Sequence, residues 1–168
     1  NNVFYWAEAY KLVNKANIVL KGLDGAVQNN VITEQVANVY RAEMRFFRAL
    51  AHLELLKHFA MPYTSTPQAS HLGVPYRTIP TITPADLEEN LKQGRNTVKE
   101  CYTLALADLD FAEANAETKA QKTGVNKIVY VTKGAAIALK IVAKQNMKDW
   151  PGVLTEFAKL QGQYSLEA

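Results

Sequence analysis

The sequence contains few of the residues that mark specialised classes of protein. It has 168 residues and one cysteine, Cys101, so no internal disulfide is possible. Eight glycines and six prolines are too few for collagen or for a flexible linker. No stretch approaches the roughly 18 uncharged apolar residues that a membrane-spanning helix needs. Phosphate-binding loops and the GxSxG, HExxH and CxxC motifs are also absent, so nothing in the sequence supports an enzyme.

The charge is nearly balanced. Nineteen Lys and Arg residues oppose 16 Asp and Glu residues, and the two signs are mixed along the chain. A nucleic-acid ligand is therefore not expected, because such proteins gather their basic residues on one face. With 48% hydrophobic residues, the chain is long enough for one compact domain, taken as 1–168. It opens on Asn1 without a signal peptide and runs to Ala168, which suggests a segment of a longer protein.

Helical periodicity dominates the chain, and no convincing strand pattern occurs. Five helices are predicted, over about 6–21, 33–58, 97–116, 131–146 and 150–161. Gly22 is predicted to end the first helix, and Thr33 to cap the start of the second. Asp149 and Pro151 indicate the start of the last helix, so close to the previous one that the two should form an antiparallel hairpin. The predicted fold class is all-α, with irregular tetratricopeptide-like pairs of helices.

One long proline-rich loop interrupts the helices, over about 60–94. It holds five of the six prolines, which exclude a long helix: Pro62, Pro67, Pro75, Pro80 and Pro84. A short helix from about Pro84 to Lys92 is possible, because proline suits the first turn. Loops of this length are uncommon in a compact domain unless they have a function.

The polar residues offer candidate sites, each with a structural alternative. Glu54 and His58 have the i, i+4 spacing of metal ligands, with His71 as a third ligand, but an exposed pair on a helix is the favoured interpretation. Cys101 is expected to be a buried small side chain rather than a nucleophile. Asn17 and Asp108 interrupt apolar stripes and are expected to satisfy backbone groups or each other's helices.

Three arginines follow a helical spacing in the second predicted helix: Arg41, Arg45 and Arg48. They could bind an anion, but a structural role against neighbouring helices is favoured. Aromatic residues form the last signal. Phe4, Tyr5 and Trp6 stand before the first predicted helix, and others lie in the loop, where they act either as ligand platforms or, as we favour, as plugs against the core.

Six groups of residues, in order along the chain, resemble motifs of the SusD/RagB family. They are Trp6, Tyr10, Val13, Ala16-Asn17 and Leu20 (family "W…Y..I..AN..L"); Ala42 to Ala49 ("GEARFLRA"); Phe59 to Pro62 ("FG.VP"); Arg95 to Val98, Tyr102 and Asp108 to Ala112 ("R.TV.EVY..I..DL..A"); Thr132 to Leu139 ("TKGAA.ALLARVYL"); and Asp149-Trp150 with Tyr164-Ser165-Leu166 ("DW" and "YSL"). Ala42 and Ala60 depart from the family's glycines, which indicates a divergent member.

The resemblance implies a function that the residues alone do not show. Members of this family are outer-membrane lipoproteins on the bacterial surface, with a tetratricopeptide-like scaffold. They capture oligosaccharides, or in some cases peptides, and pass them to a TonB-dependent SusC-type transporter without catalysis or cofactors. The membrane contact would be an N-terminal lipid anchor that this chain lacks.

The resemblance also implies where the ligand binds. In relatives, some ligand-stacking aromatics lie just before the first scaffold helix, where this chain has Asn2, Tyr5 and Trp6. Glu43, Arg45 and Arg48 match motif positions that are expected to be scaffold. The alternative to nutrient capture is a stand-alone helical-repeat adaptor that binds another protein.

Overall fold

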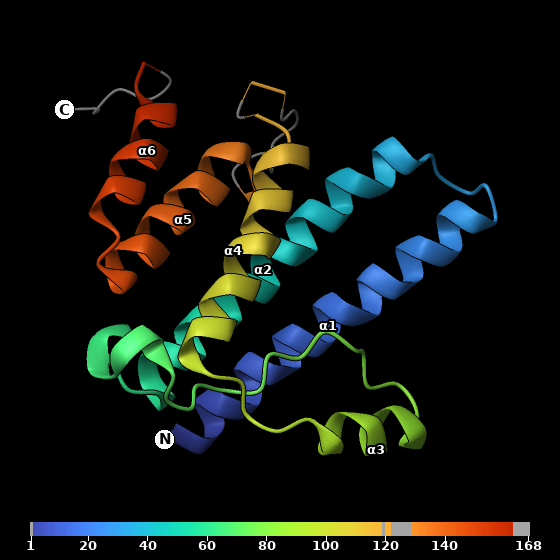
Figure 1. Ribbon diagram of the computed structural model, residues 1–168. Coiled ribbons are helices and arrows are strands. Elements are labelled where there is room, and N and C mark those ends of the chain that lie inside the picture. Colours follow the sequence, from blue (N-terminus) through green and yellow to red (C-terminus); the bar gives the residue numbers. More distant parts are fainter. Residues whose placement is uncertain (1, 119, 122–128, 163–168) are drawn as a thin grey trace.

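The computed structural model describes residues 2–118, 120–121 and 129–162, and this part of the chain folds into packed helices without a β-strand (Figure 1). The helices are α1 (Asn2–Gln28), α2 (Glu34–Phe59), α3 (Pro84–Lys92), α4 (Val98–Asn115), α5 (Lys133–Met147) and α6 (Trp150–Leu160). Two short 3₁₀ turns, η1 (Tyr63–Ser65) and η2 (Pro67–Ala69), follow α2. α1 and α2 run antiparallel, α4 packs across α2, and α5 and α6 form a hairpin beside α4. The all-α, tetratricopeptide-like fold class is confirmed.

The first helix is longer than predicted, and the prediction that Gly22 ends it was wrong. α1 passes through Gly22 and ends at Gln28, where Asn30 adopts the left-handed φ of 56° that closes the helix. The added turns are held by packing on α2, including an ion pair of 2.8 Å between Asp24 Oδ1 and Arg41 Nη2. Tertiary contacts therefore outweigh the poor helix propensity of glycine.

The other helix boundaries agree with the predictions within two residues. The starts at Thr33 and Asp149 were predicted from caps, in which a side-chain oxygen accepts a hydrogen bond from a backbone N–H of the first turn. Such caps are formed by Thr33, Thr97, Thr132 and Asp149. The antiparallel α5–α6 hairpin is also present, with only two residues between the helices. The Tyr164-Ser165-Leu166 motif lies outside the described residues.

The proline-rich loop is tied to the scaffold along its length. The short helix expected near its end is α3, which has a capping box between Thr83 and Asp86. Earlier in the loop, Tyr76 is 2% exposed, and its ring stacks on that of His52 with centroids 3.8 Å apart. Tyr10 of α1 donates a hydrogen bond of 2.8 Å to the Pro75 carbonyl. Tyr76 therefore packs as a plug against the core, which is the role favoured from the sequence for aromatic residues of the loop.

A buried polar centre joins three helices and this loop. The guanidinium of Arg48 on α2 donates to both carboxylate oxygens of Asp108 on α4, at 2.7 and 2.6 Å. It also donates to Asn17 Oδ1 on α1 at 2.8 Å, and the Tyr76 hydroxyl donates to Asp108 Oδ2 at 2.8 Å. The structural roles expected for Asn17, Arg48 and Asp108 are therefore confirmed.

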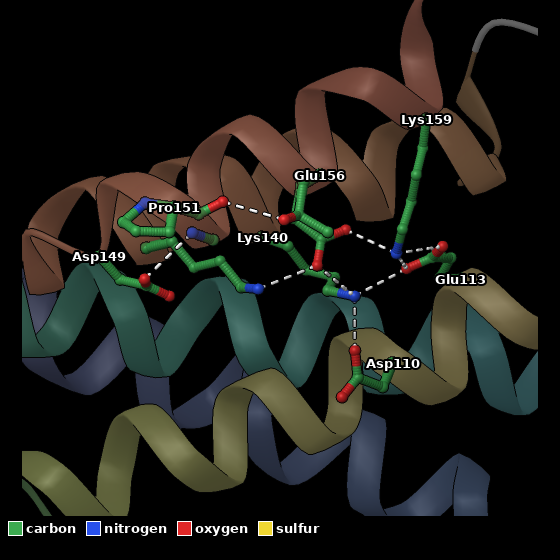
Figure 2. Close-up of polar contacts among 10 residues, drawn as sticks. Asp110, Glu113, Lys140, Asp149, Pro151, Glu156 and Lys159 are labelled. Atoms are coloured by element: carbon green, nitrogen blue, oxygen red, sulfur yellow. Dashed lines mark hydrogen bonds and ion pairs between the residues drawn. The ribbon is translucent and has the colours of Figure 1, made fainter.

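A second polar cluster holds the α5–α6 hairpin to α4 (Figure 2). Lys140 Nζ on α5 lies 2.6 Å from Asp110 Oδ1, 2.7 Å from Glu113 Oε2 and 3.0 Å from Glu156 Oε1. Lys159 Nζ on α6 completes the cluster, 2.8 Å from Glu156 Oε2 and 2.9 Å from Glu113 Oε1. Burial disfavours the charged form of Glu156, but hydrogen bonds from the surrounding lysines outweigh it and lower its pKa to about 2. These ion pairs hold α5 and α6 against α4.

Candidate functional site

The N-terminal end of α1 lies against the C-terminal end of α2, and an aromatic and polar surface forms where they meet. We call this surface the Tyr5 cluster: Tyr5, Trp6, Glu54, His58 and Phe59. The Tyr5 hydroxyl donates to Glu54 Oε2 at 3.3 Å, and the Tyr5 and His58 rings meet edge to face at 4.8 Å. Trp6 packs edge to face on Phe59 at 4.9 Å. The antiparallel packing of α1 and α2 brings together residues about 50 positions apart.

The predicted site residues have different positions within this surface. Tyr5 is 40% exposed, so its ring is open to a ligand. Trp6 is half-buried against the core, and its ring lies 4.8 Å from that of Tyr10, so it anchors α1 to the scaffold. Asn2 is the first residue of α1, and its side chain is outside what the structure describes.

The expectation that Phe4, Tyr5 and Trp6 precede the first helix was wrong, because all three lie within α1. Aromatic packing of this segment on α2 supports the additional turns. Tyr5 is therefore presented from within a helix, and its hydroxyl reaches Glu54.

Glu54 and His58 form the exposed helical pair that was favoured from their spacing. His58 Nε2 lies 3.6 Å from Glu54 Oε2, and both side chains are partly open to solvent. His71, the suggested third metal ligand, bonds elsewhere: its Nδ1 lies 2.8 Å from Thr66 Oγ1 and its Nε2 3.1 Å from the Met61 carbonyl oxygen. Among the described residues, no group of three or more His, Cys, Asp or Glu side chains could hold a metal ion.

Cys101 and the arginines likewise have structural surroundings. The thiol is fully buried, 3.3 Å from the Val74 carbonyl oxygen, and burial raises its pKa. Arg45 lies over the Phe111 ring at 4.1 Å, while Arg41 pairs with acidic side chains of α1 and α2. These contacts bear out the structural alternative given for each residue.

The Tyr5 cluster offers the chemistry of a recognition surface for polar, hydroxyl-bearing molecules. An exposed tyrosine ring stacks on the apolar face of a ligand, while the Glu54 carboxylate accepts hydrogen bonds and the His58 imidazole can donate or accept them. Burial, together with the charge of Glu54 and its hydrogen bond, raises the pKa of Tyr5, so its hydroxyl remains a donor at neutral pH. The sequence did not predict that Glu54 and His58 lie beside Tyr5, because only the packing of α1 on α2 brings them together.

The fold defines a class of protein: a tetratricopeptide-like helical scaffold, here with an exposed aromatic and polar surface at one end. The SusD-like family described as starch-binding and associating with the outer membrane matches residues 1–143, and the chain belongs to this family. The resemblance seen in the sequence motifs is thereby confirmed. No curated protein matches the chain in sequence.

Solved structures of the same superfamily have this fold. A SusD superfamily protein from Bacteroides fragilis is 29% identical with a TM-score of 0.81, and the match covers 97% of this chain and 35% of that one. A SusD-like carbohydrate-binding protein from Bacteroides vulgatus is 19% identical with a TM-score of 0.80, covering 99% and 32% of the two chains. A laminarin-binding SusD-like protein is 18% identical with a TM-score of 0.71, covering 98% and 31%. The chain thus spans about a third of the length of these relatives.

None of the helices in the described part of the chain is both long enough and apolar enough to span a bilayer.

Proposed function

We propose that this protein captures oligosaccharides, or alternatively peptides, at the bacterial outer surface and delivers them to a TonB-dependent SusC-type transporter. Membership of a carbohydrate-binding family that associates with the outer membrane supports this proposal. An N-terminal lipid anchor outside the present residues would hold the protein at the membrane. The scaffold would bring the captured ligand to the transporter.

The observation that carries the proposal is the exposed Tyr5 ring beside Glu54 and His58. A pyranose ring has an apolar face, formed by its C–H groups, and an edge of hydroxyl groups. The tyrosine matches the face, and the carboxylate and imidazole match the edge. Because both helices are fixed by packing, the surface is formed before the ligand arrives, which lowers the entropic cost of binding.

Binding without turnover is the expected chemistry of this surface. Glycoside hydrolysis ordinarily needs two carboxyl groups that flank the scissile bond, separated by about 5–9.5 Å. The Tyr5 cluster supplies one, Glu54, and that carboxylate already accepts a hydrogen bond from Tyr5. The proposed role is therefore capture rather than cleavage.

The test compares two substitutions at Tyr5. Tyr5→Ala removes the ring and should weaken binding about tenfold, or ~1.4 kcal/mol. Tyr5→Phe keeps the ring and should retain most of the affinity. Calorimetry and affinity electrophoresis with soluble starch and laminarin would measure both variants, with a peptide library as the second arm. Phe157→Ala removes an exposed aromatic ring from α6, 52% exposed against 40% for Tyr5, and serves as the control.

Two outcomes would count against the proposal. If wild type and Tyr5→Ala bind the ligand with equal affinity, the Tyr5 cluster is not the ligand-binding site. Failure of the wild type to bind any glycan or peptide, combined with stable co-purification with another protein, would favour the adaptor alternative.

A further inference from the structure

A hollow lies at the other end of α2 from the Tyr5 cluster. Its volume is about 370 Å³, within the range of small-ligand sites. The first half of α2 forms one wall, and residues that follow α4 form the other. We call it the α2 groove; its lining residues are Val36, Val39, Tyr40, Glu43, Glu117, Gln121 and Tyr130.

The α2 groove combines the same kinds of group as the Tyr5 cluster. Tyr40 and Tyr130 are 51% and 47% exposed, so a tyrosine ring is open to solvent on each wall. Glu43 and Glu117 add carboxylates, and Gln121 adds an amide that can both donate and accept hydrogen bonds. Aromatic faces beside short polar side chains fit a sugar ring, which has an apolar face and a hydroxyl edge.

The two surfaces lie along one face of the same helix. Tyr40 and His58 are 18 residues apart, which is five turns of an α-helix, so their side chains leave α2 in the same direction. Glu43 and Glu54 are 11 residues apart, close to three turns. Between them the same face carries Phe47, whose side chain is half-buried. The separation along the axis is about 27 Å at 1.5 Å per residue.

We propose that the α2 groove is a second carbohydrate subsite, and that a polysaccharide chain lies along α2 and occupies the groove and the Tyr5 cluster together. The inference rests on the proposed function at the Tyr5 cluster and extends it to the length of the ligand. Occupation of one subsite makes the second binding step intramolecular, so a long chain gains affinity that a short one does not. The rigid helix fixes the spacing, so the protein selects polymers over their short fragments.

The test measures long and short ligands against variants of each subsite. Soluble starch and laminarin are the long probes, and maltose and laminaribiose are the short ones. Tyr40→Ala is expected to weaken polysaccharide binding at least tenfold in affinity electrophoresis. Tyr130→Ala, on the opposite wall, should have the same effect and provides a second variant if Tyr40→Ala does not fold. Phe157→Ala is the matched control on α6.

A site-resolved readout separates the two subsites. In a ¹⁵N NMR titration of the wild type, maltose or laminaribiose should shift backbone amides beside Tyr40 as well as those beside Tyr5. In Tyr40→Ala the shifts at the groove should disappear while those at the Tyr5 cluster persist. Circular dichroism and thermal melting confirm that each variant is folded.

The outcomes distinguish the two proposals. If Tyr5→Ala loses affinity while Tyr40→Ala and Tyr130→Ala stay within twofold of wild type, the second subsite is refuted and the proposed function stands. If the wild type binds peptides but no glycan, the subsite is refuted while the proposed capture function stands; if it binds neither, both proposals fail. If the Tyr40 variant keeps polysaccharide binding but loses co-purification with a transporter, the groove is a protein contact, which also overturns the inference.

Discussion

Removal of the negative charge at Asp108 should destabilise the whole scaffold. Asp108→Asn keeps the shape of the side chain but leaves Arg48 as a buried cation without its carboxylate partner. Both side chains of the pair are buried, at 9% exposure for Arg48 and 6% for Asp108. Water therefore cannot replace the lost interaction, and the Tyr76 hydroxyl loses its charged acceptor as well.

The expected cost can be estimated from comparable buried ion pairs. Removing one partner of such a pair costs about 3–5 kcal/mol, because an uncompensated charge remains in the interior. A domain of this size has a total stability of about 5–15 kcal/mol, so the loss is a large fraction. At about 2–4 °C per kcal/mol, the midpoint of thermal unfolding should fall by about 6–20 °C. Tyr76→Phe removes only one hydrogen bond to a charged group and should cost about 1.5–3 kcal/mol.

Urea unfolding followed by circular dichroism would measure these changes, with the m-value checked for constancy. Asp110→Asn is the matched control, since it makes the same chemical change on the same helix at a side chain that is 62% exposed. Lys140, the partner of Asp110, keeps Glu113 and Glu156, so that control should cost less than about 1 kcal/mol. A loss below 1 kcal/mol for Asp108→Asn, or equal losses for the two variants, would refute the assignment of Asp108 as the central buried partner.

Four further predictions concern two helical glycines and two titrating groups. Gly22→Ala should raise the free energy of unfolding by about 0.5–1 kcal/mol, because a Cβ there contacts nothing within 4 Å and alanine favours the helix; a lower melting temperature would contradict this. Gly152→Ala should have the opposite sign in the same melting assay, since its Cβ would collide with the carboxylate of Asp149 that caps α6. Burial lowers the pKa of His52 to about 4, so stability should decline as pH falls from about 6.5 towards 4, where only the unfolded state takes up the proton; an NMR titration giving a pKa of 6 or more would disprove it. The pKa of Glu156 is also lowered, so its contribution is complete above about 4.5 and lost towards pH 2, and Glu156→Gln should flatten that part of the stability profile measured by urea unfolding.

Local signals in the sequence were sufficient for most of the helices. Thr33 and Asp149 cap the helices whose starts they predicted, because a capping side chain acts only on the turn that follows it. Gly22 misled the prediction for α1, since its effect depends on contacts with a helix that follows later in the chain. The polar residues Asn17 and Asp108 could be assigned to the interior from the apolar stripes they interrupt, but their shared partner Arg48 could not.

The candidate site was predictable only in part. The aromatic segment could be identified by resemblance to a family, which pointed to Tyr5 and Trp6. Their different exposure follows from the rotation of α1 against α2, and the sequence does not encode that rotation in any local pattern. The same packing places Glu54 beside Tyr5, although spacing alone had suggested a different use for this carboxylate.

The attachment of the proline-rich loop has a consequence for how ligands are recognised. The backbone N–H of Arg77 donates a hydrogen bond to His52 Nε2 at 3.1 Å. The hydroxyl of the preceding residue, Tyr76, donates to Asp108 Oδ2. Lifting this part of the loop would take one hydrogen bond from the Asp108 carboxylate and one from the His52 imidazole and would uncover the buried Tyr76 ring, so the loop acts as a brace. Crystals of free and ligand-bound protein should therefore superpose closely over residues 74–81, with the adaptation to a ligand confined to exposed side chains.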